Sequence, residues 1–178
     1  MRARALGLVL GIVAAGALAA GPEIKVLKVG AHSISLSWDS AWHVAPPDNG
    51  PPPNAAQFQL ADPHDMLVQI SAQERPSADA DVDAYMRHVI DGAVKDFQKT
   101  SVEKKLEPRA FSKDGTHGYT VCATDRKPKP DEFKYVCQGV ATDGELAVIF
   151  TVLYNERGKQ SAEKATAALE ALQIVTAA

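Results

Sequence analysis

The sequence predicts an α+β domain in which a mainly antiparallel β-sheet is covered by helices on both faces. Three observations support this fold class. Short apolar or alternating segments separated by turn residues dominate the second half of the chain. One long segment, residues 80–99, has the periodicity of an amphipathic helix. The strands of the second half are apolar on both faces, so each face of the sheet needs a covering layer.

The N-terminal residues have the organisation of a cleavable secretory signal. Arg2 and Arg4 precede an uncharged, apolar run over residues 5–20, which ends in small side chains suited to cleavage. The run is shorter than the roughly 20 residues that a membrane-spanning helix needs. We expect residues 1–19 to be a signal peptide and residues 20–178 to form one soluble domain, periplasmic or secreted, with no stable membrane insertion after cleavage.

The mature part is mildly acidic. Without Arg2 and Arg4, 17 basic side chains remain against 22 acidic ones, a net charge near −5. The charges are spread along the chain without long blocks of one sign. This balance argues against nucleic acid as a partner.

The first half of the mature chain is expected to form two hairpins followed by the long helix. The predicted strands are residues 24–29, 32–38, 57–60 and 66–73. Gly30-Ala31 joins the first pair, and the turn-forming sequence Asp62-Pro63-His64-Asp65 joins the second. Between the hairpins, residues 44–54 contain five prolines, which exclude regular structure and favour a stiff exposed loop.

The second half is expected to form an antiparallel meander closed by a short C-terminal helix. The predicted strands are residues 102–111, 118–124, 133–142 and 145–155, and the helix spans residues 161–172. Asp143-Gly144 is typical of a two-residue hairpin turn. Such a turn pairs Thr142 with Glu145 and Cys137 with Phe150.

Cys122 and Cys137 are the two cysteines of the chain. A hairpin centred near Lys129 and Pro130 places them directly opposite each other, where Cα atoms are about 4.5 to 5.5 Å apart, within disulfide range. An oxidising compartment favours the bond. The alternative is a redox-active pair, but the C-x-x-C spacing that lowers a thiol pKa is missing. We therefore predict a structural disulfide.

The order of these elements resembles the PsbP-like and DcrB-like exported proteins, over most of residues 24–176. The best local matches are Trp38 to Pro47, the Gly118-Tyr119 strand, and the Leu146 to Tyr154 strand leading to residues 168–172. The resemblance implies an α/β/α sandwich that docks to or assists larger assemblies at or beyond a membrane, without chemistry of its own. The proline cluster and the cysteine pair depart from the family pattern.

Motifs for catalysis, metal binding and cofactor binding are missing from the sequence. None of the five histidines has a tight metal-ligand spacing such as H-x-x-x-H. Asp62-Pro63-His64-Asp65 offers possible ligands, but the same residues form a turn. Neither a G-x-S-x-G elbow nor a glycine-rich phosphate loop occurs. We predict no catalytic residue, metal or cofactor, and the alternative is a site assembled only in three dimensions.

The strongest candidate for partner binding combines aromatic side chains with the stiff loop, because aromatic area and a pre-ordered backbone reduce the entropy lost on binding. The candidate residues are Trp38, Trp42, His43, Pro46, Pro47, Pro51, Pro52 and Pro53. In the alternative interpretation, Trp38 fills the core and the prolines only shape the loop. The basic segment 126–130 could attract an acidic partner, or it could be an ordinary charged hairpin tip.

The sequence therefore predicts an exported, non-catalytic binding or accessory protein of the cell envelope. It would act through contact with an envelope or secreted protein, in one form as an inhibitor or immunity-type protein. The alternative is an envelope hydrolase or a metal-dependent enzyme.

Overall fold

The computed structural model describes residues 23–45, 55–74 and 81–176. The strands are β1 Glu23–Val29, β2 His32–Trp38, β3 His43–Val44, β4 Ala55–Gln59, β5 Met66–Glu74, β6 Arg109–Lys113, β7 Thr116–Thr124, β8 Tyr135–Thr142, β9 Leu146–Tyr154 and β10 Gln173–Thr176. The helices are α1 Val82–Phe97, the short 3-10 helix η1 Glu156–Gly158, and α2 Lys159–Glu170. None of the described helices has the length and apolarity to span a membrane.

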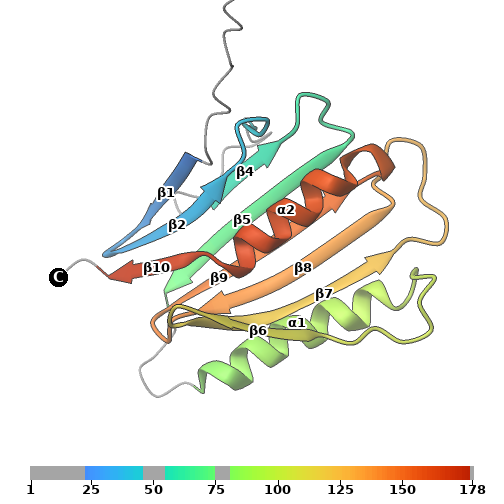
Figure 1. The fold of residues 1–178 in the computed structure, drawn as a ribbon. Helices are drawn as coiled ribbons and strands as arrows, with labels where there is room; N and C mark the ends of the chain where they lie inside the picture. Colours follow the sequence, from blue (N-terminus) through green and yellow to red (C-terminus); the bar gives the residue numbers. More distant parts are fainter. Residues whose placement is uncertain (1–22, 46–54, 75–80, 177–178) are drawn as a thin grey trace, which may run out of the picture.

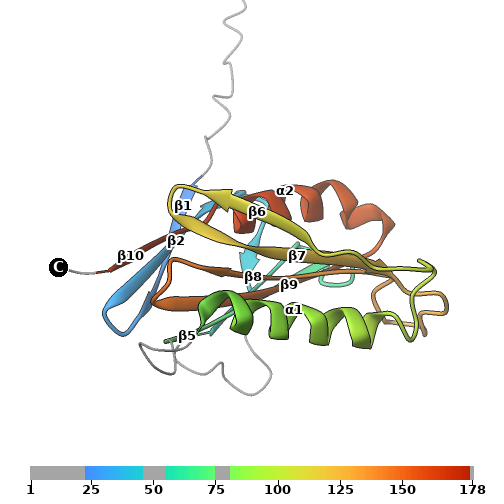
Figure 2. The ribbon, with the colours of Figure 1, turned by 90° about the horizontal axis from the view of Figure 1, so that it is seen from below.

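These elements form two antiparallel sheets, one of seven strands in the order β3-β4-β5-β9-β8-β7-β6 and one of three in the order β1-β2-β10 (Figure 1). The large sheet is the middle layer, with α1 on one face and α2 on the other (Figure 2). The predicted α+β class and its α/β/α layering are confirmed. Strands β3 and β10 were not predicted from the sequence, and β3 includes Val44, which was assigned to the irregular loop.

The two helices cover different halves of the large sheet. Helix α1 packs on β7 and β8, whereas α2 packs on β9 and β5 and also contacts β2. The small sheet lies beside α2, and its buried side chains Ile34, Leu36 and Trp38 join the larger apolar core. This offset of the helices leaves part of each face of the large sheet without a helix above it.

Apolar side chains form a separate core on each face. The larger core, on the α2 face, includes Phe58, Met66, Val68, Ile70, Leu146, Val148, Phe150, Val152, Ala165 and Leu169. The smaller core, on the α1 face, consists of Ile90, Ala93, Leu106, Val121 and Ala123. Removal of this apolar area from water is the main force that holds the layers together.

Helix α1 follows from its sequence at its N-terminus and along its apolar stripe. Asp81 is the N-cap, and its carboxylate accepts a hydrogen bond of 3.1 Å from the backbone N–H of Ala84. Met86, Ile90 and Ala93 are the buried residues of the helix, and they lie on the apolar stripe that the periodicity predicts.

The β7–β8 register is confirmed, because Cys122 pairs directly with Cys137. The hairpin of β1 and β2 through Gly30-Ala31 is confirmed as well, since Val29 pairs with His32. Gly30 has a φ of 57°, a left-handed conformation that glycine adopts without steric cost.

The predicted register of β8 and β9 is wrong by two residues. Thr142 pairs with Ala147, so Cys137 lies opposite Val152 and Gly139 lies opposite Phe150. The Asp143 carboxylate accepts hydrogen bonds of 3.0 Å from the N–H groups of residues 145 and 146, which widens the turn beyond two residues. A shift of two preserves the face of every side chain, so the buried pattern is unaffected.

The strand predicted at residues 102–111 begins only at Arg109. Residues 98–108 instead form a connection that folds back against the end of β7, where Val102 N–H donates to Thr124 O at 2.9 Å. The apolar residues of this segment resemble a strand, but Leu106 is used to fill the α1-side core.

Candidate functional site

Two clefts lie where the helices leave the large sheet open. The first, the α1 cleft, lies between the C-terminal end of α1, the ends of β7 and β8, and the loop over residues 125–134. The second, the disulfide groove, lies on the opposite face between α2 and strands β6 to β9.

The α1 cleft has a volume of about 420 Å³, within the roughly 300 to 1,000 Å³ of most ligand pockets. Its lining residues are Phe97, Thr100, Ser101, Ala123, Thr124, Asp125, Asp131, Glu132, Phe133, Lys134, Val136 and Leu153. The apolar members come from α1, from the sheet and, for Phe133, from the β7–β8 connection, and the polar members come from the connections and, for Thr124, from the end of β7. The cleft therefore combines an apolar interior with a polar rim.

The floor of the cleft continues onto an open part of the sheet. Val136 and Leu153 pair directly on β8 and β9, and Leu153 pairs with Leu67 on β5. These three side chains form one row on the α1 face of the sheet. The cleft thus opens sideways onto β5.

The neighbouring row on this face is polar but uncharged. Gln57, Gln69, Thr151 and Gln138 are paired in succession across β4, β5, β9 and β8. Gln69 is exposed, and the other three are half-buried. The surface beside the cleft can therefore form hydrogen bonds without a requirement for charge.

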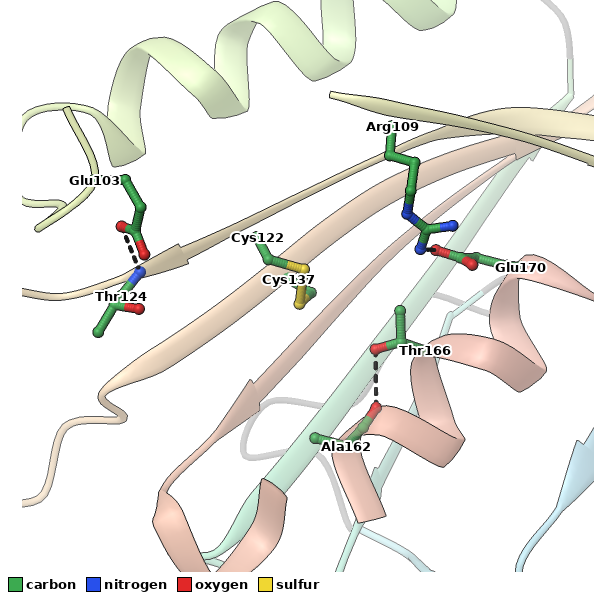
Figure 3. Close-up of a disulfide and its surroundings, with 8 residues drawn as sticks. All are labelled: Glu103, Arg109, Cys122, Thr124, Cys137, Ala162, Thr166 and Glu170. Atoms are coloured by element: carbon green, nitrogen blue, oxygen red, sulfur yellow. Dashed lines mark hydrogen bonds and ion pairs between the residues drawn. A yellow bond between two sulfur atoms is a disulfide. The ribbon is translucent and has the colours of Figure 1, made fainter. Parts of the chain in front are cut away.

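The connection after α1 is fixed to β7 by Glu103. Its carboxylate accepts a hydrogen bond from the Ser101 hydroxyl. It accepts a second one, of 3.1 Å, from the N–H of Thr124 (Figure 3). The Gln98 side chain supports the same connection through the carbonyl of Glu103, at 2.8 Å, and the N–H of Leu106, at 3.1 Å. These contacts position Ser101 and Thr124 in the wall of the cleft.

The environment of Glu103 favours its charged form. Burial acts to raise the pKa of this carboxyl, but the hydrogen bonds from Ser101 and Thr124 outweigh burial, so the pKa lies below its usual value. Glu103 is therefore a structural anion, and its carboxylate is already occupied by protein donors.

Three acidic residues and one basic residue line the cleft. Lys134 contacts Tyr135 and pairs with Glu156 at 2.9 Å, and these two interactions raise its pKa. Lys129 pairs with Glu132 at 2.9 Å. The carboxylates of Asp125 and Asp131, in contrast, form no ion pair with another described residue. Two carboxylates without an ion pair thus lie at the mouth of the cleft. The Asp125 carboxylate accepts from the Lys127 N–H at 2.7 Å, and the neighbouring Arg126 guanidinium donates to the carbonyl of Ser101 at 2.6 Å.

The disulfide groove is smaller, at about 250 Å³, and its floor is the bond between Cys122 and Cys137 (Figure 3). Arg109 of β6 and Glu170 of α2 form an ion pair of 2.5 Å beside it. Tyr154 contributes another wall and stacks on the neighbouring Tyr135 with ring centroids 5.0 Å apart. Cys122 is exposed to the groove, whereas Cys137 is buried.

The structure separates the residues predicted to bind a partner. Trp38 and Trp42 are only 3% and 4% exposed, and Trp38 packs edge-on against Trp42 and Phe58. Both indoles belong to the core. For Trp38 this is the alternative interpretation given above, and for Trp42 it is contrary to the expected role in binding. His43 is exposed on β3. Pro46, Pro47, Pro51, Pro52 and Pro53 lie outside the described residues, so a role for the loop in binding stays a prediction.

The segment Asp62-Pro63-His64-Asp65 forms the predicted turn, with the Asp62 carboxylate accepting from the His64 N–H at 3.0 Å. Arg157 bridges both carboxylates of this turn, Asp62 at 2.8 Å and Asp65 at 3.0 Å. Within the described ranges, no three His, Cys, Asp or Glu side chains are grouped as metal ligands would be. The α1 cleft and the disulfide groove contain no histidine.

Sequence reasoning missed both clefts. Phe97 was expected as part of the apolar stripe of α1, and Phe133, Val136 and Leu153 fell within predicted strands. Their convergence depends on where the segment after α1 crosses β7, which no local pattern specifies. The sequence pointed to the basic segment 126–130 of this loop, whereas the acidic residues on either side of it, Asp125, Asp131 and Glu132, are the ones that line the cleft.

The solution structure of cyanobacterial PsbP (CyanoP) from Synechocystis sp. PCC 6803 is similar to this chain, with a TM-score of 0.51 and 13% sequence identity. The match covers 92% of this chain and 99% of that chain. The sequence matches no family model and no curated protein. At this identity the likeness concerns the fold alone, and it confirms the resemblance expected from the sequence: the chain has a PsbP-like fold.

Proposed function

We propose that this protein is an exported, non-catalytic binding or accessory protein of the cell envelope that acts through protein–protein contact. An inhibitor or immunity-type protein is one form of this function. The observation that carries the proposal is the α1 cleft, an apolar depression with a polar rim that opens onto an uncharged strip of sheet. Protein interfaces are built in this way, with an apolar centre and a polar surround.

The disulfide supports the exported location, because such bonds form and persist in oxidising compartments. The signal peptide predicted at residues 1–19 supports the same location. Sequencing of the N-terminus of the protein purified from a periplasmic or culture fraction tests both predictions. A mature N-terminus near Ala20 is expected, whereas an intact N-terminus in the cytosolic fraction would contradict export.

Affinity capture tests the binding function. The oxidised mature protein is used as bait in an envelope extract, and bound proteins are identified by mass spectrometry. We expect one saturable partner that is retained with equal yield from extracts treated with metal chelators. No reproducible partner would contradict the proposal and favour the alternative, an envelope hydrolase or metal-dependent enzyme, which thermal-shift screening with metals and small ligands would then test.

A second bait examines the predicted role of the proline loop. Deletion of residues 46–53 removes the five prolines without touching a residue that lines the α1 cleft. Loss of the partner with this bait would assign the contact to the loop. Retention of the partner would assign it to the described surface.

A further inference from the structure

We infer that the α1 cleft receives an apolar side chain of the partner protein that is flanked by lysine or arginine. This inference rests on the proposed function and specifies the chemistry of the partner. It follows from the shape of the cleft, the charge of its rim and the surface onto which it opens.

The interior of the cleft selects an apolar group. Phe97 and Phe133 are half-buried at its walls, and Val136 and Leu153 are half-buried at its floor. These side chains retain apolar area that a partner side chain would remove from water, and each Å² removed contributes about 25 cal/mol. The volume of about 420 Å³ accommodates a side chain as large as phenylalanine.

The rim selects positive charge. Asp125 and Asp131 have no side-chain cation within ion-pair distance among the described residues, while Lys134 and Lys129 are neutralised by Glu156 and Glu132. A cation beside the apolar group would therefore be attracted by these two carboxylates, against the positive charge of Arg126, whose guanidinium donates to the Ser101 carbonyl at 2.6 Å.

The surroundings favour a polypeptide as the occupant. The row of Val136, Leu153 and Leu67 leads out of the cleft across three strands, and the Gln69–Thr151–Gln138 row runs beside it. Strands are about 4.8 Å apart, so this surface is long enough to contact several residues of an extended segment. Glutamine side chains can donate to and accept from the backbone of such a segment.

The probe that tests this inference is a capped pentapeptide with phenylalanine between two lysines. It is titrated into the ¹⁵N-labelled, oxidised protein at low salt and followed by NMR. We expect saturable shifts confined to the amides of Thr100, Ser101, Thr124, Phe133 and Val136. A peptide with glutamates in place of the lysines should bind about three- to tenfold more weakly, and one molar salt should remove the difference.

Asp125→Asn with Asp131→Asn removes the rim charge at nearly constant shape, and asparagine tolerates the positive φ of 69° at residue 131. This variant should bind the lysine and glutamate peptides equally. The matched control is Asp91→Asn with Asp114→Asn, two exposed sites outside the cleft, one of them also at positive φ. The control should retain the preference for the lysine peptide.

Several results would overturn the inference. Shifts outside the cleft, or equal affinity of the wild type for the two peptides, would exclude a cationic partner segment at this site. Phenethylamine that binds as tightly as the lysine peptide would assign the cleft to small cationic amphiphiles instead. If the wild type and a bait carrying Asp125→Asn, Asp131→Asn and Phe133→Ala capture the envelope partner equally, the proposed function stands and this inference fails.

Discussion

Cys122 and Cys137 face each other across β7 and β8 with their Cα atoms 4.0 Å apart and close the hairpin whose loop forms one wall of the α1 cleft. The loop over residues 125–134 is thus anchored at its base by a covalent bond. It is anchored beyond the bond by the Asp125 N–H, which donates to the carbonyl of Lys134 at 2.8 Å. The disulfide and the candidate binding surface belong to one structural unit.

Replacement of both cysteines by serine should lower the free energy of unfolding by about 3 kcal/mol, because the bond closes a loop of about 16 residues in the unfolded chain. Denaturant titration of the oxidised wild type and the variant measures the difference. The reduced wild type is the control and should resemble the variant. A variant as stable as the oxidised wild type would show that the bond contributes nothing to folding.

Gly139 should not accept a side chain. A Cβ built at this position would meet the ring of Phe150, on the paired strand β9, at 2.1 Å. Gly139→Ala is therefore expected to destabilise the protein by about 1 to 3 kcal/mol through overpacking. Chemical denaturation measures the change.

Gly92→Ala is the matched control for Gly139→Ala. Gly92 lies in α1 with no atom within 4 Å of a built Cβ, so alanine should stabilise the helix by up to about 1 kcal/mol. We expect Gly139→Ala to lower the free energy of unfolding and Gly92→Ala to raise it. Equal effects would show that the Phe150 ring moves aside freely.

The sequence predicted most of the elements because their signals are local. The prolines and lysines of residues 127–130 specified the β7–β8 hairpin, and so the cysteine pairing. The Asp143-Gly144 turn was assigned the wrong length, because the side chains of Thr142 and Asp143 cap the backbone of the turn. Backbone preferences of the turn residues do not report such side-chain bonds.

The non-local features were beyond reach of the sequence. Strand β10 pairs with β2, more than a hundred residues earlier in the chain, and its four residues have little pattern of their own. The α1 cleft depends on Glu103, which fixes residues 101–103 to β7. A single glutamate in a polar segment gave no sign of this role. Trp42 was expected to be exposed for partner binding because it is aromatic and precedes the proline loop, but its side chain is buried.

Glu103→Gln should destabilise the protein by about 1 to 3 kcal/mol near neutral pH, because the hydrogen bonds from Ser101 and Thr124 go to a charged acceptor. The pKa of Glu103 is lower in the folded protein than its ordinary value of 4.5. Its stabilising contribution is therefore complete above that value and is lost as the pH falls through the lower, folded-state pKa.

Urea titrations of the wild type and Glu103→Gln across this pH range measure the effect. The difference in unfolding free energy between the two proteins should narrow on acidification. Glu107→Gln is the control, since Glu107 is exposed and its carboxylate pairs at the surface with Lys105, at 2.6 Å. A difference that stays constant with pH would show that the variant acts through shape and not through charge.

Trp38 and His43 were both candidates for partner contact. We expect substitution of Trp38 to lower the free energy of unfolding much more than substitution of His43. Trp38→Ala removes a ring packed against Trp42 and Phe58 and should lower the free energy of unfolding by about 3 to 5 kcal/mol. His43→Ala changes an exposed side chain and should stay within about 0.5 kcal/mol of the wild type. Both values come from denaturant titration. A Trp38→Ala variant as stable as the wild type would contradict burial of this side chain and favour its interpretation as a contact residue.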